Sequence, residues 1–122
     1  MRHRRAHRAL NRHWKPRMAL LRTQVRQLLE HTRIVTTDAK AKEVQSLVEP
    51  ILTKLMEGGQ HNLRLADALV NDRELLHKVT TEIVPHLKAG GGYTSIIKVA
   101  PRRGDGTPRS VLQINLPTTT TA

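Results

Sequence analysis

Apolar residues recur at helical spacing near the start of the chain. Pro16 suits the first position of a helix, because its ring fixes φ and the amide it lacks has no helical partner there. One face of the segment that follows carries Leu20, Leu21, Val25, Leu28 and Leu29. This pattern predicts a first helix over residues 16–31.

A short extended segment and a longer helix are predicted next. Residues 33–36 include β-branched side chains and are predicted to form a strand or extended connector, after which Thr37 or Asp38 can cap a helix. This helix is expected to run from Asp38 to the glycine pair 58–59. Its apolar stripe consists of Ala41, Val44, Leu47, Val48, Ile51, Leu52, Leu55 and Met56.

Pro50 lies inside this second helix. It has no backbone amide to donate to the carbonyl of Ser46, so the helix is expected either to kink at this point or to break into two helices. The apolar stripe continues on both sides of Pro50, and this continuity favours the kink.

Two shorter helices are predicted after the glycine pair. Asp72 is placed to cap the second of them, and Pro85 is expected to disturb that helix near its end. The apolar positions of the first are Leu63, Ala66, Leu69 and Val70, and those of the second are Leu75, Leu76, Val79, Ile83, Val84 and Leu87.

Two strands are predicted in the last part of the chain. Gly90, Gly91 and Gly92 break the helical pattern, and β-branched strands are expected over 94–99 and 110–116, joined by a long hairpin loop over 101–109. The element order is therefore helix, strand, three helices and two strands. It predicts an α+β fold in which the helices pack on one face of a small mixed sheet.

The length of 122 residues leaves room for one domain and one modest core. We expect a single α+β domain over residues 16–117, a basic N-terminal arm over 1–15 and a disordered tail over 118–122. The chain has no Phe, one Trp and one Tyr, so the core must be aliphatic and stacking of bases on several aromatic rings is excluded. The absence of Cys excludes disulfides, thiolate metal sites and a Cys nucleophile.

Positive charge is concentrated at the start of the chain. The chain has 21 Lys and Arg against 10 Asp and Glu, a net charge of +11. Nine of the basic residues precede the first acid, Glu30, which leaves 21 − 9 = 12 basic and 10 acidic residues in the remainder. The remainder is thus balanced like an ordinary protein surface, and the first segment is not.

An unbalanced segment of this kind predicts a polyanionic partner. Self-repulsion should keep the arm unfolded until phosphates neutralise it, and the less interesting alternative is a merely solvated charge run. Arg outnumbers Lys eight to one before Glu30, and guanidinium groups grip phosphates in pairs and stack on unpaired bases. These preferences favour RNA over a membrane, and the apolar runs are too short to cross a bilayer.

The sequence marks no enzyme chemistry. The glycine run 90–92 follows a helix and precedes a strand, the reverse of a phosphate-binding Walker loop, and it lacks the Gly-Lys-Ser/Thr ending. The seven histidines show no metal-ligand spacing, and no nucleophile-elbow pattern is present. We therefore expect no enzymatic activity, no cofactor, no metal, no small-molecule substrate and no membrane partner.

Three further groups of residues are candidates for RNA contact. Arg102 and Arg103 lie in the hairpin loop with only Asp105 to oppose them, although they could simply be solvated. Lys40 and Lys42 occupy the first turn of the second helix, where the helix dipole disfavours cations, so their placement indicates an external anion. Tyr93 could stack on a base, but packing against the sheet is the favoured alternative.

Four segments of the chain resemble one known family, the bacterial-type large-subunit ribosomal protein L-seventeen. The first combines residues 1–4, 10–12 and 19–22 and is similar to the family's N-terminal signature. The second combines 31–37 and 39–43 and is similar to its strand-to-helix junction. The third and fourth, 91–98 and 101–106, are similar to its last hairpin in type and order. Four segments in the correct order make coincidence improbable.

The resemblance implies an α+β fold and a place on the large ribosomal subunit near the peptide exit tunnel. It also implies binding to large-subunit ribosomal RNA and contact with neighbouring large-subunit proteins. Three features depart from the family pattern: residues 13–15 replace small polar residues, Pro50 interrupts a helix, and Ser95 replaces an Arg, so Ser95 should not inherit a phosphate contact. These departures and the threonine-rich tail favour a ribosome of the mitochondrial matrix, with the bacterial cytoplasm as the alternative.

The sequence as a whole predicts a structural constituent of the large ribosomal subunit that supports subunit assembly and translation. The alternative is a basic protein that compacts DNA or RNA outside the ribosome, although no helix-turn-helix or dimer seam is present. Recognition is expected to depend on RNA shape more than on base edges. The predicted RNA contacts are Arg2, His3, Arg4, Arg5, Arg8, Asn11, Arg12, Lys15, Arg17, Arg22, Lys40, Lys42, Tyr93, Lys98, Arg102 and Arg103.

Overall fold

The computed structural model describes residues 3–4 and 6–117. The predicted tail over 118–122 and two predicted RNA contacts, Arg2 and Arg5, lie outside the described residues. The element order confirms the prediction of a helix, a strand, three helices and two strands, with a short 3₁₀ helix, Val84–His86, after the last helix. The elements are α1 (Trp14–His31), β1 (Arg33–Thr37), α2 (Asp38–Glu57), α3 (Gln60–Val70), α4 (Arg73–Glu82), β2 (Thr94–Val99) and β3 (Arg109–Ile114).

The first helix begins two residues earlier than predicted. The backbone amide of Arg17 donates to the carbonyl of His13 at 3.0 Å, so Trp14, Lys15 and Pro16 form the first turn. Amides of the first turn have no helical acceptor, and Pro16 is therefore tolerated at the third position as well as at the first.

The second helix runs without a break through Pro50, so the chain does not split into two helices there. Thr37 occupies the capping position, one of the two predicted for it, but its side chain makes no capping hydrogen bond. The carboxylate of Asp38 accepts instead from the hydroxyl of Ser110, at 2.8 Å, on the central strand. A tertiary contact thus replaces the expected local one.

The end of the helical region agrees with the sequence prediction. The backbone amide of Leu75 donates to the Asp72 carboxylate at 3.0 Å, which confirms Asp72 as the cap of α4. This helix ends at Glu82, and the chain continues in the 3₁₀ turn that contains Pro85.

The sheet is antiparallel throughout rather than mixed. Its strand order is β1-β3-β2, and β3 pairs antiparallel with both neighbours. The hairpin forces β3 to run opposite to β2, and β3 then fills the place between β2 and β1, so no parallel strands are adjacent. Strand β3 starts at Arg109 and ends at Ile114, one residue before and two residues before the predicted bounds.

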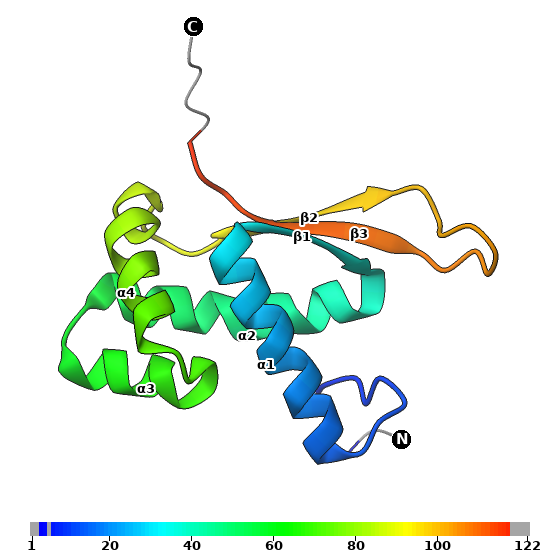
Figure 1. Ribbon diagram of the computed structural model, residues 1–122, viewed down its shortest axis with the longest axis horizontal. Coiled ribbons are helices and arrows are strands. Elements are labelled where there is room, and N and C mark those ends of the chain that lie inside the picture. Colours follow the sequence, from blue (N-terminus) through cyan, green and yellow to red (C-terminus); the bar gives the residue numbers. More distant parts are fainter. Residues whose placement is uncertain (1–2, 5, 118–122) are drawn as a thin grey trace, which may run out of the picture.

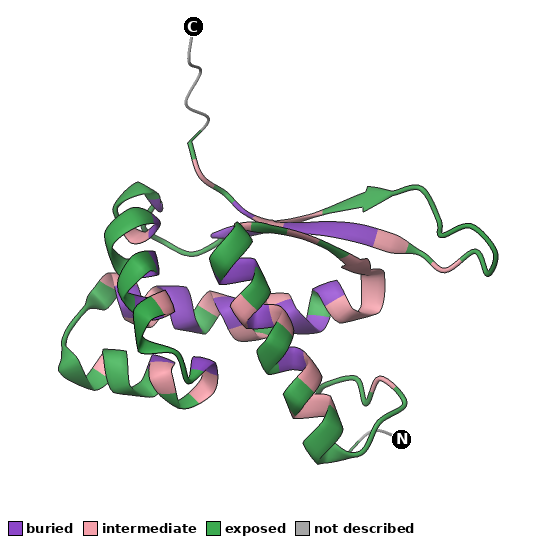
Figure 2. Ribbon diagram, in the orientation of Figure 1, coloured by how far each residue is buried: buried purple, intermediate pink, exposed green. Residues whose placement is uncertain are grey.

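The helices lie on one side of the sheet, as predicted (Figure 1). Helices α1 and α2 cross beneath the strands, and α3 and α4 pack against α1 and α2 on the side away from the hairpin loop. Apart from Tyr93, the core is aliphatic, and it lies between these layers (Figure 2). Its most deeply buried side chains include Leu21, Val25, Leu28, Leu29, Val44, Val48, Leu52, Leu76 and Leu112. Within the described residues, no helix combines the length and apolarity needed to cross a membrane.

Candidate nucleic-acid interface

Residues 6–13 of the basic arm lie against the domain. The guanidinium Nε of Arg17 in α1 donates to the carbonyl of Arg8 at 2.7 Å. The imidazole Nδ1 of His7 lies 3.3 Å from a carboxylate oxygen of Glu43 in α2, a side chain that is almost fully buried. A turn closed by the Arg12 amide and the Ala9 carbonyl, at 3.1 Å, shapes the arm between these contacts. The sequence predicted an arm that acquires structure on RNA, whereas the structure gives residues 6–13 defined contacts with the domain.

The start of α2 connects the arm to the hairpin loop. Glu43, which contacts the arm, and Asp38 both belong to the first part of α2. The amide of Asp38 donates to the carbonyl of Pro108 at 3.1 Å, and its carboxylate accepts from Ser110. The arm and the hairpin loop therefore each contact the first part of α2, and both lie on the side of the molecule away from α3 and α4 (Figure 1). Most of the predicted contacts belong to these three segments.

Most of the predicted contacts that the structure describes are accessible to solvent. Arg17 and Lys40 are half-buried. The exposed ones are His3, Arg4, Arg8, Asn11, Arg12, Lys15, Arg22, Lys42, Lys98, Arg102 and Arg103.

Two of the predicted cations form ion pairs with acids of the same chain. Lys42 lies 3.1 Å from the Asp38 carboxylate, one helical turn away. The hydrogen bond from Ser110, and after it the one from Lys42, holds the pKa of Asp38 below its usual value. Lys42 thus has an internal partner, which weakens the argument that its place in the first turn requires an external anion.

Arg102 is the second paired cation. Its guanidinium binds Asp105 within the hairpin loop, with Nε 3.1 Å from the carboxylate. This pairing raises the pKa of Arg102 and lowers the pKa of Asp105, which also accepts from Thr107. Both side chains are half exposed, so the pair gives the loop a defined shape rather than much stability. Arg103, the next residue, is exposed.

Tyr93 is buried, which argues against the predicted RNA contact. The residue is only 5% exposed and belongs to the hydrophobic core, which confirms the packing alternative. Its ring is therefore covered by the domain, and no base can stack on it without unfolding this region.

The sequence analysis did not single out Arg109, which lies at the base of the hairpin loop. Its Nε donates to the carbonyl of Ala100 at 3.2 Å, which places the guanidinium across the base of the hairpin loop. The predicted pairing of two strands around a loop that ends at this residue was the available signal, because such a pairing brings the two ends of the loop together.

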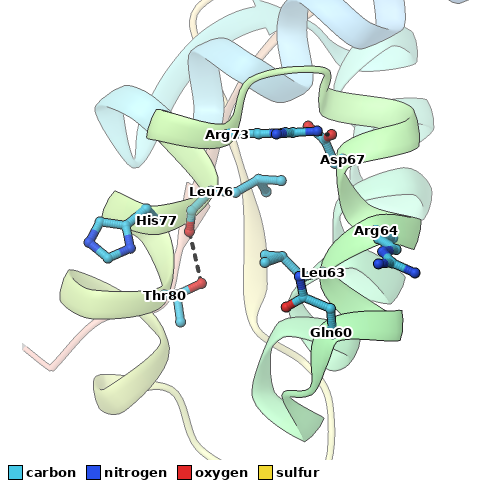
Figure 3. A pocket seen from close by; sticks show the side chains of 8 residues that line it. All are labelled: Gln60, Leu63, Arg64, Asp67, Arg73, Leu76, His77 and Thr80. Atoms are coloured by element: carbon cyan, nitrogen blue, oxygen red, sulfur yellow. Dashed lines mark hydrogen bonds and ion pairs between the residues drawn. The ribbon is translucent and has the colours of Figure 1, made fainter.

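The opposite end of the molecule has a different character. Helices α3 and α4 enclose a groove of about 440 Å³ with Leu63 and Leu76 on its walls (Figure 3). Nε of Arg73 lies 3.6 Å from the Asp67 carboxylate across the top of this groove. Residues 60–82 contain three Lys and Arg against four Asp and Glu, so this end is not suited to a polyanion. Within the described part of the chain, no three His, Cys, Asp or Glu residues are grouped to hold a metal ion.

Known proteins are similar in sequence to this chain over nearly its whole length. The profile of the family described as Ribosomal protein L17 matches residues 20–115. A protein of Pelobacter propionicus named large ribosomal subunit protein bL17 is 40% identical over 93% of this chain and 91% of its own length. Proteins of that name from Dictyoglomus thermophilum and Geobacter metallireducens are each 43% identical over 93% of this chain, which covers 99% and 65% of their lengths. The chain therefore belongs to the Ribosomal protein L17 family, a family of structural rather than enzymatic proteins.

Proposed function

We propose that this protein is a structural constituent of the large ribosomal subunit and binds large-subunit ribosomal RNA through its basic end. The observation that carries the proposal is that the basic arm and the hairpin loop, both of which carry exposed cations, each contact the first part of α2. An end assembled from three segments can contact several RNA phosphates at once, and each contact releases counterions.

The arm supplies most of the charge. No acid precedes Glu30, and the side chains of Arg8, Arg12 and Lys15 are exposed. Because Arg17 and Glu43 hold the arm against the helices, the entropy lost when the arm binds is smaller than for a free chain. The arm would thus lie between RNA helices while the domain docks beside it, which fixes RNA tertiary contacts.

The hairpin loop contributes a second and weaker set of contacts. Arg103 and Lys98 are exposed and can approach phosphates, whereas Arg102 forms an ion pair with Asp105. We therefore expect Arg103 to contribute more to RNA affinity than Arg102. The loop's defined shape suits recognition of RNA form rather than of base sequence.

We also propose contact with neighbouring large-subunit proteins near the peptide exit tunnel, which rests on the family resemblance alone. Cross-linking within purified subunits tests this placement. The mitochondrial matrix expected from the sequence is not supported, since all three relatives above are bacterial. Their source favours a ribosome of bacterial type.

The first experiment is sedimentation of tagged protein through a high-salt sucrose gradient. Stoichiometric migration with the large subunit supports the structural role. Protein that remains at the top, or that follows DNA, contradicts it and favours a compacting protein outside the ribosome.

Salt dependence then tests the basic end. If six to ten phosphates are engaged, the affinity for a large-subunit RNA transcript should fall ~10³- to 10⁵-fold between about 50 and 200 mM salt. Replacing Arg8, Arg12 and Lys15 together by Ala should reduce the slope of log affinity against log salt by ~2 to 3. The matched control replaces the exposed cations Arg64, Lys78 and Lys88 at or near the opposite end, and it should leave most of the slope intact.

A further inference from the structure

Trp14 is the most exposed of the large apolar side chains that the structure describes. It is the first residue of α1, and 66% of its surface is open to solvent. It makes no contribution to the core, where α1 inserts Leu21, Val25, Leu28 and Leu29. The largest aromatic ring of the chain is therefore placed at the surface, and folding does not account for it.

The surroundings of Trp14 belong to the proposed RNA-binding end. The guanidinium carbon of Arg17 lies 5.6 Å from the centre of the indole ring, and its Nε donates to the carbonyl of Arg8. Arg17 thus holds the ring beside the arm. His13 and Lys15 flank it in sequence and are exposed. The ring sits where the arm joins α1, with the guanidinium of Arg17 over one of its faces.

We propose that Trp14 stacks on one unpaired base of the bound RNA. A base offers a flat π-face to the indole, and its own phosphates meet the neighbouring cations, a combination that an aliphatic protein segment does not provide. Arg17 occupies one face of the ring, so the base stacks on the other. The inference rests on the proposed function and extends it, because it names an unpaired nucleotide rather than a duplex as the target.

The chain carries its own reporter for this contact. Trp14 is the only Trp, so excitation at the red edge of protein absorption selects its emission from that of Tyr93. The experiment titrates the full chain with a transcript of bacterial large-subunit ribosomal RNA. Stacking on a base should quench the Trp14 emission in proportion to the RNA bound. Coverage by an apolar protein surface in the subunit would shift the emission to the blue instead.

Two variants separate stacking from electrostatic attraction. Trp14→Leu keeps an apolar residue in an exposed helical turn and should weaken RNA binding about 5- to 150-fold, the equivalent of ~1–3 kcal/mol per stacked base. Trp14→Phe keeps an aromatic face and should recover part of that loss. Neither should change the slope of log affinity against log salt, because neither alters charge. Val35→Ala, at an exposed apolar residue on the sheet, is the matched control and should bind normally.

The outcomes distinguish this inference from the proposed function. Quenching together with weaker binding of Trp14→Leu at an unchanged salt slope supports the stacking contact. Salt-dependent binding of the wild-type chain with unaltered emission, and with normal affinity of Trp14→Leu, overturns the stacking contact alone. A blue shift that occurs only in the assembled subunit overturns it as well and assigns Trp14 to a protein neighbour. A wild-type chain that fails to bind the transcript overturns the proposed function itself.

Discussion

The carboxylate of Glu49 in α2 accepts a hydrogen bond from the backbone amide of Thr94, at 2.9 Å, where β2 begins. The same carboxylate accepts from the amide of Tyr93 at 3.2 Å and from the hydroxyl of Thr94. Gln45, one turn earlier in α2, donates to the Thr94 hydroxyl at 3.1 Å. Helix α2 thus fixes the point at which the chain leaves its glycine run and enters the sheet.

Loss of this carboxylate should destabilise the domain. Glu49→Ala leaves two backbone amides in a partly buried site without their acceptor, and the free energy of unfolding should fall by ~1–3 kcal/mol. Glu49→Gln keeps one acceptor oxygen and should lose less. Urea unfolding measures both, with Glu82→Ala, an exposed residue in α4, as a control that should change little. Equal stability of Glu49→Ala and the wild type would mean that these amides find other acceptors.

Much of the fold could be predicted because its signals are local. The apolar spacing before Glu30 and the stripe of α2 require no knowledge of other elements, and both helices are present. The role of Glu49 could not be predicted, since its partners are 44 and 45 residues away in sequence. The end of α1 at Thr32 could not be predicted either. Thr32 adopts the left-handed conformation, with φ of 62°, which β-branched residues rarely adopt.

The candidate site, too, could be predicted from the sequence only in part. A run of cations without acids is visible in sequence, so the arm could be identified. Its docking could not, because that depends on His7 meeting a buried Glu43 on another helix. Ser110 and Asp38, which bring the hairpin loop to α2, are 72 residues apart. Tyr93 was uncertain from sequence because one aromatic residue before a strand suits either the surface or the core.

Removal of the arm's contacts should expose it to proteolysis. His7→Ala removes the contact with Glu43, and Arg17→Ala removes the donor to the Arg8 carbonyl. Trypsin should then cleave after Arg8 and Arg12 faster than in the wild type, and the double variant should be cleaved fastest. His86→Ala, at an exposed histidine in the 3₁₀ turn, is the control. Unchanged cleavage in the double variant would show that other contacts hold the arm.

Acid should weaken the link between α2 and the hairpin. The hydrogen bond from Ser110, followed by that from Lys42, lowers the pKa of Asp38 below its ordinary value of 3.8. A carboxylate whose pKa is lower in the folded state stabilises it fully above the ordinary value, and this contribution is lost as the pH falls through the lowered pKa. Asp38→Asn should therefore differ most from the wild type near neutral pH.

The measurement for Asp38 is urea unfolding of both proteins over a pH series. The difference in unfolding free energy should be constant down to about pH 4 and should shrink below it. Asp72→Ala, which removes an exposed helix cap, serves as a comparison for the loss of a local rather than a tertiary acceptor. A difference between Asp38→Asn and the wild type that does not shrink in acid would mean that Asp38 stabilises the fold without its charge.

Pro50 should limit the stability of α2. The residue lies in the helix interior and is exposed, so its ring adds nothing to the core, while the carbonyl of Ser46 loses the amide that any other residue would offer. Pro50→Ala should raise the free energy of unfolding by up to ~3 kcal/mol. Pro85→Ala is the matched control: Pro85 stands at the start of a 3₁₀ turn, where proline costs little, so that variant should gain nothing. Thermal unfolding compares the two, and a Pro50→Ala variant no more stable than the wild type would mean that α2 already accommodates the ring without a lost hydrogen bond.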